Sequence, residues 1–511
     1  MMVSLGKRMA RAAGIQLIGN LVRVVLGMAA SVMMVRWLGA EEFGKASWMV
    51  SLTLYFSVLF SGGIGIPFTR SLTHARLAGD RRGAFSLVGR LWFLRLAVSA
   101  LVLALCFLTK SMAPQVLGQL PAGDLLLFVP FLLLVSFLHG NLIRVLQVNF
   151  RPGLVSFLAA IEIITKVALL RLIGGADPDA SALVLAAIGS ETIALVGAAL
   201  ASTRILWQMK PAALPSDNHH PMPGISALLV SGRPTWLLSI AQRILGRDVD
   251  ILLLGLMAGP VEITKYALSY TLATIGLSLA SSAFQSTTAV SAFTESSAES
   301  SPDARARLLK AMLEYWLVFV TPIGVGGILL GGRFLHFLYG GAADGTNAVV
   351  ALLFGAFCLG ELSSLGKDAL HGMGKDNRPA RAHWSGGAVN LTFSILLIPH
   401  YGALGAAGAT LMASIIVAVI QYRFLLTNLN CSPERRSLLA SLAALSVLAG
   451  SVLIANLLGS GQNDSPMRLS MTVLFAGVAY LLTLGIIGPN TSLRQGCATG
   501  PRALRLARRI L

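Results

Sequence analysis

The stretch SALVLAAIGSETIALVGAALAST, residues 181–203, contains a single charged side chain, Glu191. The hydrocarbon core of a bilayer is about 30 Å thick, and a helix of roughly 20 residues crosses it. The rest of the chain has a similar composition, since 55% of its 511 residues are hydrophobic and only 12% are charged. A soluble domain carries about 25% charged residues. The sequence therefore predicts an all-α integral membrane protein.

Apolar windows of this length recur along the chain and predict about 14 transmembrane helices. Two windows, 226–257 and 263–290, are long and interrupted by polar residues, so we expect bent or tilted helices that line a cavity. The other windows are 12–35, 46–66, 91–109, 124–147, 153–173, 181–203, 311–331, 347–371, 381–399, 404–427, 437–458 and 468–488.

Positive charge gathers on one side of this predicted bundle. The net charge of +18 would suggest nucleic-acid binding in a soluble chain. Cytoplasmic loops of membrane proteins retain Lys and Arg, however, and with both termini inside most of the 40 Lys and Arg residues fall in inside segments. The outside segments hold only Arg36, Lys45, Lys110, Arg171, Lys265, Arg333 and Arg468. We therefore predict cytoplasmic termini and no nucleic-acid partner.

A weak internal repeat indicates two similar halves of the chain. It pairs Arg23 with Arg243, and the Arg-Pro pair at 151–152 with the one at 378–379. Six-helix halves enter the membrane in the same orientation, so the repeats are parallel. The predicted organisation is an N-terminal six-helix lobe at 1–204, a cytoplasmic linker at 205–225, a C-terminal six-helix lobe at 226–430, and two helices with a basic cytoplasmic tail at 431–511.

Enzyme chemistry has no recognisable motif in the sequence: no phosphate-binding loop, nucleophile elbow or metal-ligand cluster occurs. The four cysteines and the linker pair His219 and His220 lack the spacing of metal ligands. We predict that the chain is not an enzyme, has no metal site and needs no cofactor.

Four segments resemble the polysaccharide flippases of the multidrug/oligosaccharidyl-lipid/polysaccharide exporter superfamily, the type that translocates O-antigen or capsule repeat units. They are VRWLGAEEFGKASW at 35–48, GIGIP at 63–67, FLHFLYGG at 334–341, and HGMGKDNRPARAHWSGGAVNLTFSILLIPHYGALGAAGATLMAS at 371–414. The last is the most telling, because an Asn in a helix followed by an Ile-Pro turn rich in Gly and Ala is similar to such flippases. The resemblance extends over essentially the whole chain.

This resemblance implies two six-helix lobes around a central cavity, and alternating access. The implied substrate is a polyprenyl-pyrophosphate oligosaccharide, moved from the cytoplasmic to the outer face of a bacterial inner membrane. A proton or sodium gradient is a candidate energy source that the sequence does not decide. Membrane lipids are expected partners, and a polysaccharide polymerase and a chain-length regulator are candidate partners.

Charged side chains inside the predicted spans are candidates for function, since each costs at least about 2.5 kcal/mol to insert. A pyrophosphate headgroup carries negative charge, and the fork of an arginine matches phosphate oxygens. We therefore predict that Arg23, Arg243 and Arg247 bind substrate. Two carboxylates beside them, Asp248 and Asp250, are candidates for cation coupling. The alternative is an ion pair of either carboxylate with Arg247 between the lobes.

Other polar residues in the spans have structural interpretations. Glu162 and Lys166, four residues apart, are expected to form an ion pair on one helix face. Glu361 and Asn390 either line a cavity or form hydrogen bonds between helices. Arg95 is expected to reach the cytoplasmic interface from near a helix end.

Several alternatives to repeat-unit transport stay open at this point. A lipid II flippase or a cation-coupled drug exporter of the same superfamily is the nearest. A membrane-embedded polymerase or ligase would need a large extracytoplasmic loop, whereas the predicted outside loops are short. A scaffold in a synthesis complex would tolerate replacement of the intramembrane arginines.

Overall fold

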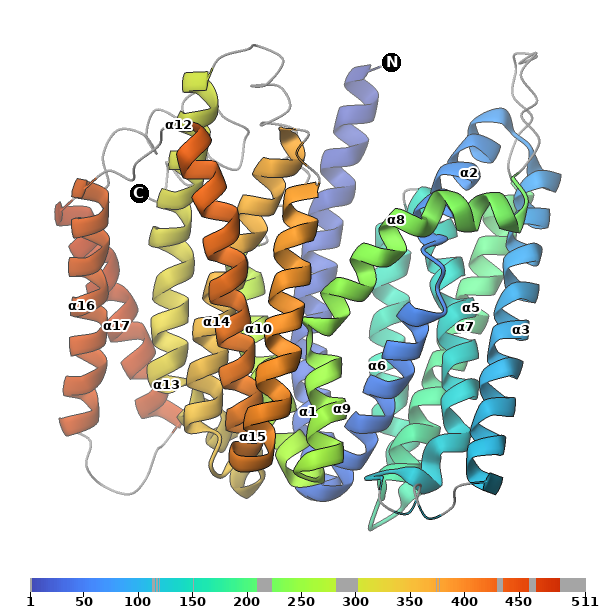
Figure 1. Cartoon of the computed structure of the whole chain (residues 1–511), viewed down its shortest axis with the longest axis horizontal. Coiled ribbons are helices and arrows are strands. Elements are labelled where there is room, and N and C mark those ends of the chain that lie inside the picture. The colour runs from blue at the N-terminus through green and yellow to red at the C-terminus, as the bar shows by residue number, and fades with distance from the viewer. Residues whose placement is uncertain are drawn as a thin grey trace. The chain divides into compact units, whose positions relative to one another are not determined.

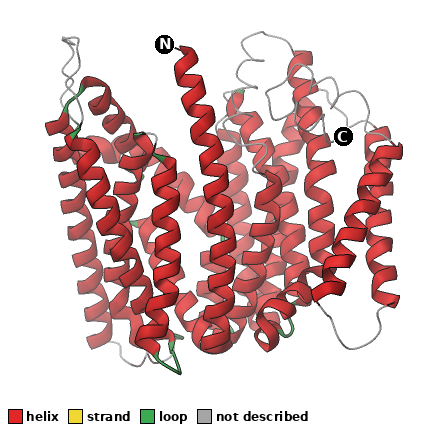
Figure 2. Cartoon of the chain, turned by 180° about the vertical axis from the view of Figure 1, so that it is seen from behind, coloured by secondary structure: helices red, strands yellow, loops and turns green. Residues whose placement is uncertain are grey.

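The computed structural model describes residues 2–112, 120–149, 151–208, 223–281, 302–373, 377–429, 435–458 and 466–487, with the single residues 115, 118 and 375. Regular structure in this part of the chain is entirely helical (Figures 1 and 2). Eight helices in it are long and apolar enough to cross a membrane, and shorter apolar helices accompany them. The predicted all-α membrane fold is confirmed. The described residues of the predicted windows lie on helices, except at 60–64 in the window 46–66 and at 245–246 in the window 226–257.

The chain forms two compact units, Met1–Thr264 and Lys265–Leu511. Unit 1 begins with two transmembrane legs in one long helix, α1, which is interrupted only at Gly39, where φ is 75°. Helix α1 is Met2–Leu59. The other elements of unit 1 are α2 (Gly65–Ala78), α3 (Arg81–Met112), the 3₁₀ turn η1 (Gly123–Phe128), α5 (Val129–Val148), α6 (Pro152–Gly174), α7 (Ala180–Trp207), α8 (Ile225–Ile244), α9 (Arg247–Met257) and the start of α10 (Pro260–Ser281).

Unit 2 contains most of α10 and a second long helix, α15, which bends at Gly402. Its Tyr266 hydroxyl, on α10, lies 3.1 Å from the hydroxyl of Thr410 on α15. The elements of this unit after α10 are α12 (Pro302–Tyr315), the π-helical turn η2 (Trp316–Val320), α13 (Thr321–Tyr339), η3 (Gly340–Ala343), α14 (Asn347–Gly372), α15 (Asn377–Leu429), α16 (Arg435–Leu458) and α17 (Pro466–Ile487).

Helices α8 and α9 pack within unit 1. The Trp236 side chain of α8 donates to carbonyls at the end of α1, and Trp48 of α1 donates to the Leu252 carbonyl of α9. The boundary between the compact units therefore lies after α9, whereas the lobes were predicted to meet at the linker. Most of that linker, including His219 and His220, lies outside the described residues, and the lobe boundaries stay a prediction.

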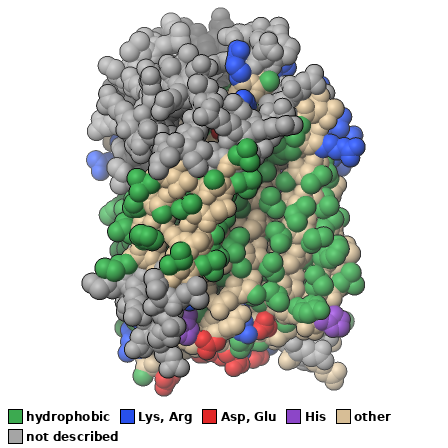
Figure 3. Space-filling view, turned by 90° about the vertical axis from the view of Figure 1, so that its left-hand side faces the viewer, with side chains coloured by type: hydrophobic (Ala, Val, Ile, Leu, Met, Phe, Trp, Pro, Cys, Tyr) green, Lys and Arg blue, Asp and Glu red, His purple; other side chains and the backbone are tan. Residues whose placement is uncertain are grey.

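The helices bury small and aliphatic residues against each other and turn large apolar ones outward. One core cluster of unit 1 joins α2, α3 and α5 through residues such as Phe68, Leu87 and Val145, all fully buried. Phe93 and Leu172 are more than 70% exposed, as lipid-facing side chains are. On the face in Figure 3, hydrophobic side chains cover the middle and charged ones gather toward the ends. This distribution suits a chain whose middle contacts lipid.

Candidate functional site

The second leg of α1 and the helix α2 are separated by a break at Phe60–Ile64. Gly62 and Gly63 have φ of 61° and 64°, a left-handed conformation that favours glycine. Helix α8 also approaches closely here, since a Cβ on Gly63 would lie 2.1 Å from the Gly232 carbonyl oxygen. These two requirements explain a Gly-Gly pair inside an otherwise apolar transmembrane segment.

Side chains of α3 and α8 bind the carbonyl oxygens that this break frees. The Arg95 guanidinium donates through Nη1 to the Phe60 carbonyl at 3.0 Å and through Nη2 to the Ser61 carbonyl at 3.2 Å. Trp236 Nε1 donates to the Val58 and Leu59 carbonyls at 3.1 and 3.0 Å. Each unsatisfied backbone group at membrane depth would cost several kcal/mol, so these donors stabilise the break.

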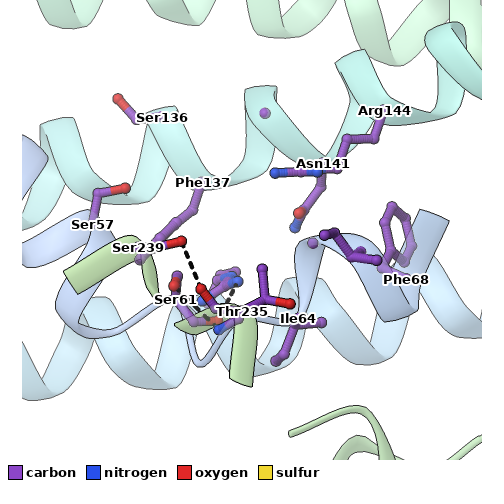
Figure 4. A pocket seen from close by; sticks show the side chains of 15 residues that line it. Ser57, Ser61, Ile64, Phe68, Ser136, Phe137, Asn141, Arg144, Thr235 and Ser239 are labelled. Carbon is purple, nitrogen blue, oxygen red and sulfur yellow. Dashed lines mark hydrogen bonds between the residues drawn. The ribbon is translucent and has the colours of Figure 1, made fainter. Parts of the chain in front are cut away.

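A cavity of about 230 Å³ lies between the break, α3, α5 and α8 (Figure 4). Asn141 and Arg144 project into it from α5, and Thr235 and Ser239 line it from α8. Its other polar lining side chains are Ser57, Ser61, Arg95 and Ser136. The cavity therefore combines hydroxyls, an amide and two guanidinium groups within the helices of unit 1.

The two arginines of this cavity have no acidic partner in the described part of the chain. Arg95 is 5% exposed, and its guanidinium lies 4.2 Å from the centre of the Phe137 ring. The Arg144 guanidinium lies against the start of α2, where a Cβ on Gly65 would be 2.7 Å from its Nη2. Within the described residues, neither arginine forms an ion pair with a carboxylate. The cavity is therefore positively charged.

Asn141 adds an unused donor to this cavity. It is 7% exposed, and its Nδ2 has no hydrogen-bond partner within the described residues. At the other side of the cavity, the Ser136 hydroxyl donates to Glu191 at 2.8 Å, and His139 Nδ1 lies 3.7 Å from the same carboxylate. The Glu191 carboxylate, on α7, therefore interacts with Ser136 and His139 of α5.

The predicted substrate arginines lie at two places in unit 1. Arg23 is exposed on the first leg of α1 and forms no ion pair within the described residues. Arg243 lies in the last turn of α8 and pairs with Asp248 across the break at Leu245–Gly246. Arg247 and Asp250 belong to the first turn of α9, where Asp250 is fully buried. The expected bend in this segment is confirmed, whereas substrate binding and ion coupling stay predictions.

The remaining predicted polar residues lie as follows. Lys166 Nζ is 3.4 Å from Glu162 Oε1 on α6, so the predicted ion pair is confirmed. In unit 2, Glu361 is half-buried on α14, and Asn390 is fully buried on the first leg of α15. Among the residues that the structure describes, no group of three His, Cys, Asp or Glu side chains could hold a metal ion.

The sequence interpretation of Arg95 is wrong. Its side chain does not reach a helix end but is buried against Phe137 and bonded to the break. Helix α3 begins at Arg81, well before its apolar window, so Arg95 lies about four turns into the helix. Sequence reasoning also missed Asn141 and Arg144 as candidates, although both lie inside the predicted window 124–147. The available signal was the pair Gly62-Gly63, which marks a helix interruption.

Comparison with known proteins supports the fold. No family model matches the chain. Over 112 residues it is 32% identical to an uncharacterized membrane protein of Methanocaldococcus jannaschii, so the match spans 22% of this chain and only 22% of the length of that curated relative.

Solved structures match over far more of the chain. Lipid II flippase MurJ in an inward closed conformation aligns with a TM-score of 0.69 and 16% identity, over 92% of this chain and 98% of that one. An inward-facing multidrug resistance MATE transporter gives 0.59 and 12%, over 82% and 99%. The Vibrio cholerae MATE transporter VcmN gives 0.55 and 15%, over 83% and 98%. The chain therefore has the fold of transporters of the MOP superfamily.

Proposed function

We propose that the chain is a flippase that moves polyprenyl-pyrophosphate-linked oligosaccharides from the cytoplasmic to the outer face of a bacterial inner membrane. The observation that carries this proposal is a cavity inside a bundle of apolar helices that holds two arginines, neither of which has a carboxylate partner among the residues that the structure describes. Such a site suits an anionic group that must enter the membrane. The fold shared with a lipid II flippase and with drug transporters supports transport rather than enzyme chemistry.

In this proposal Arg23, Arg243 and Arg247 contact the pyrophosphate during transport. Arg243 would exchange its partner Asp248 for substrate, which frees the carboxylate to take up a cation. Asp248 and Asp250 would then couple transport to a proton or sodium gradient. Both termini would lie in the cytoplasm, and the glycan would feed capsule, O-antigen or exopolysaccharide synthesis through a polymerase and a chain-length regulator.

A second candidate cargo is lipid II, because the structure of a lipid II flippase aligns with this chain with a TM-score of 0.69. Both cargoes are sugars on a polyprenyl pyrophosphate, so the headgroup chemistry is the same. A multidrug cargo is less well supported, since a cavity lined by Arg95 and Arg144 repels the cationic drugs that a carboxylate would attract.

Complementation separates these cargoes. The chain is expressed in one strain that lacks its repeat-unit flippase and in another depleted of its lipid II flippase. We expect surface polysaccharide in the first strain and no rescue of growth in the second. Rescue of the second strain alone would assign lipid II. Rescue of neither, at normal membrane expression, would contradict the proposed function.

The predicted arginines are tested in the strain that is rescued, at matched membrane expression. We expect Arg23→Ala and Arg243→Ala to reduce surface glycan and to cause lipid-linked units to accumulate on the cytoplasmic face. Arg204→Ala, an exposed arginine at the end of α7, is the matched control and is expected to transport normally. Equal transport by all three variants would assign Arg23 and Arg243 structural roles.

A further inference from the structure

We infer that the cavity between the α1–α2 break, α3, α5 and α8 is a binding site for pyrophosphate or phosphate, held by Arg144, Asn141 and the first turn of α2. The site is distinct from the predicted substrate arginines Arg23, Arg243 and Arg247. Its use for a lipid-linked anion rests on the proposed function, whereas its affinity for the anion does not.

Charge is the first argument for an anion. Arg95 and Arg144 both line a cavity of about 230 Å³, and no carboxylate pairs with either within the described residues. Arginine keeps its charge at any working pH. Two like charges repel each other strongly in a medium of low dielectric constant. An anion bound between them attracts both and so offsets this repulsion. A bound phosphate group therefore completes the charge balance of this cavity.

Donor geometry is the second argument. Arg95 uses both Nη atoms on the carbonyls of the break, so its role is to position that segment and to add charge. The Arg144 guanidinium forms no hydrogen bond within the described residues. Asn141 Nδ2, one helical turn from it, is buried and has no hydrogen-bond partner among the described residues. Arg144 and Asn141 thus present free donors from one face of α5 toward the same space (Figure 4).

The start of α2 supplies the third argument. Gly65 and Ile66 line the cavity, and the preceding residue, Ile64, provides no side-chain cap. The first turn of a helix leaves backbone N–H groups without an intrahelical partner, and the helix dipole favours an anion there. A side chain on Gly65 would displace the Arg144 guanidinium, so the missing Cβ keeps the arginine beside these N–H groups.

Cavity size limits the ligand to a small anion or headgroup. Pockets that enclose drug-sized molecules measure about 300–1,000 Å³, more than the volume of about 230 Å³ found here. An oligosaccharide therefore has to remain outside while a phosphate or pyrophosphate group enters. The same chemistry could belong to a lipid headgroup or to a free anion.

Titration calorimetry on the purified full chain in detergent tests this site. The two probes are inorganic pyrophosphate and farnesyl pyrophosphate, a lipid-linked form of the same group. We expect both to bind the wild type and to compete with each other. Arg144→Gln is expected to weaken binding about ten- to a hundredfold, because it removes charge-assisted hydrogen bonds. Asn141→Leu, of similar volume, is expected to weaken it about threefold to tenfold.

Arg204→Gln is the control, since α7 runs in the same direction as α5 and Arg204, like Arg144, lies near its C-terminal end. It should bind as the wild type does. Binding of inorganic pyrophosphate without farnesyl pyrophosphate would support the site and assign a free anion. No binding to wild type, or equal binding by wild type, Arg144→Gln and Asn141→Leu, would overturn the inference. Export of glycan in cells is measured separately, so loss of the site and loss of the proposed function give different results.

Discussion

Two helix breaks of unit 1 differ in how the charge of a nearby arginine is balanced. At the α1–α2 break, Arg95 donates to two backbone carbonyls, and Arg144 nearby has no acidic partner within the described residues. At the α8–α9 break, Arg243 pairs with Asp248. At the first break the positive charge stays available to a ligand, whereas at the second break Asp248 neutralises it. A helix break inside a membrane can therefore serve either as an anion site or as an ion-paired joint.

The largest effect is expected from Gly63→Ala at the first break. Alanine is strained at a φ of 64°, and its Cβ would lie 2.1 Å from the backbone oxygen of Gly232. Strain and overpacking together should destabilise the chain by about 3 kcal/mol or more. The measurement is the unfolding midpoint of the purified protein in detergent. An unchanged midpoint would mean that α8 can move away from the break.

Arg95→Met is expected to have the next largest effect. It leaves the Phe60 and Ser61 carbonyls without the arginine donors and should cost about 2–3 kcal/mol of stability. Arg90→Met, an exposed arginine on the same helix, is the control for lost charge and should change stability by less than about 0.5 kcal/mol. Equal unfolding midpoints for the two variants would show that the break does not depend on Arg95.

At the second break, Arg243→Ala is expected to cost about 1–2 kcal/mol, because it leaves the Asp248 carboxylate buried and unpaired. The Arg243 side chain is 34% exposed, so we expect less than the 3–5 kcal/mol typical of fully buried pairs. The double variant Arg243→Ala/Asp248→Asn should recover most of this loss. If the double variant is as unstable as the single one, the missing interaction is packing and not charge.

The smallest effect is expected from Gly246→Ala at the second break. Gly246 has a φ of −98°, which any residue adopts, and a Cβ would lie 3.1 Å from its nearest neighbour, the Gln242 carbonyl oxygen. The cost should stay below about 1 kcal/mol. A midpoint as low as that of Gly63→Ala would remove the proposed difference between the two breaks.

Hydropathy and charge place most of the apolar helices of this chain, because lipid requires apolar side chains over a fixed length. They do not predict α2, which lies almost entirely outside the apolar windows. They also predict the Glu162–Lys166 pair, since its spacing along one helix determines its geometry. The cavity could not be predicted in this way. It depends on Arg144 and Asn141 of α5 and on the N-terminus of α2, which lie on different elements. It also depends on a helix break that an average over an apolar window does not detect.

Arg95 illustrates the same limit. Its position was measured from the edge of an apolar window, but the helix extends beyond that edge to Arg81. Composition marks where lipid begins, whereas hydrogen bonding determines where a helix begins, and the two points differ at a basic membrane face. A buried arginine was therefore interpreted as an interfacial one.

The single-residue interruption of α1 at Gly39 has a consequence for how the chain enters a membrane. Two transmembrane legs meet there without an intervening loop, and Glu42, just beyond the interruption, accepts a hydrogen bond from the backbone N–H of Ala180 at 2.9 Å. We expect the two legs to insert together as one hairpin, because a single non-helical residue joins them. An epitope tag placed at Gly39 would therefore disturb biogenesis, whereas the same tag in a longer connection would report topology harmlessly.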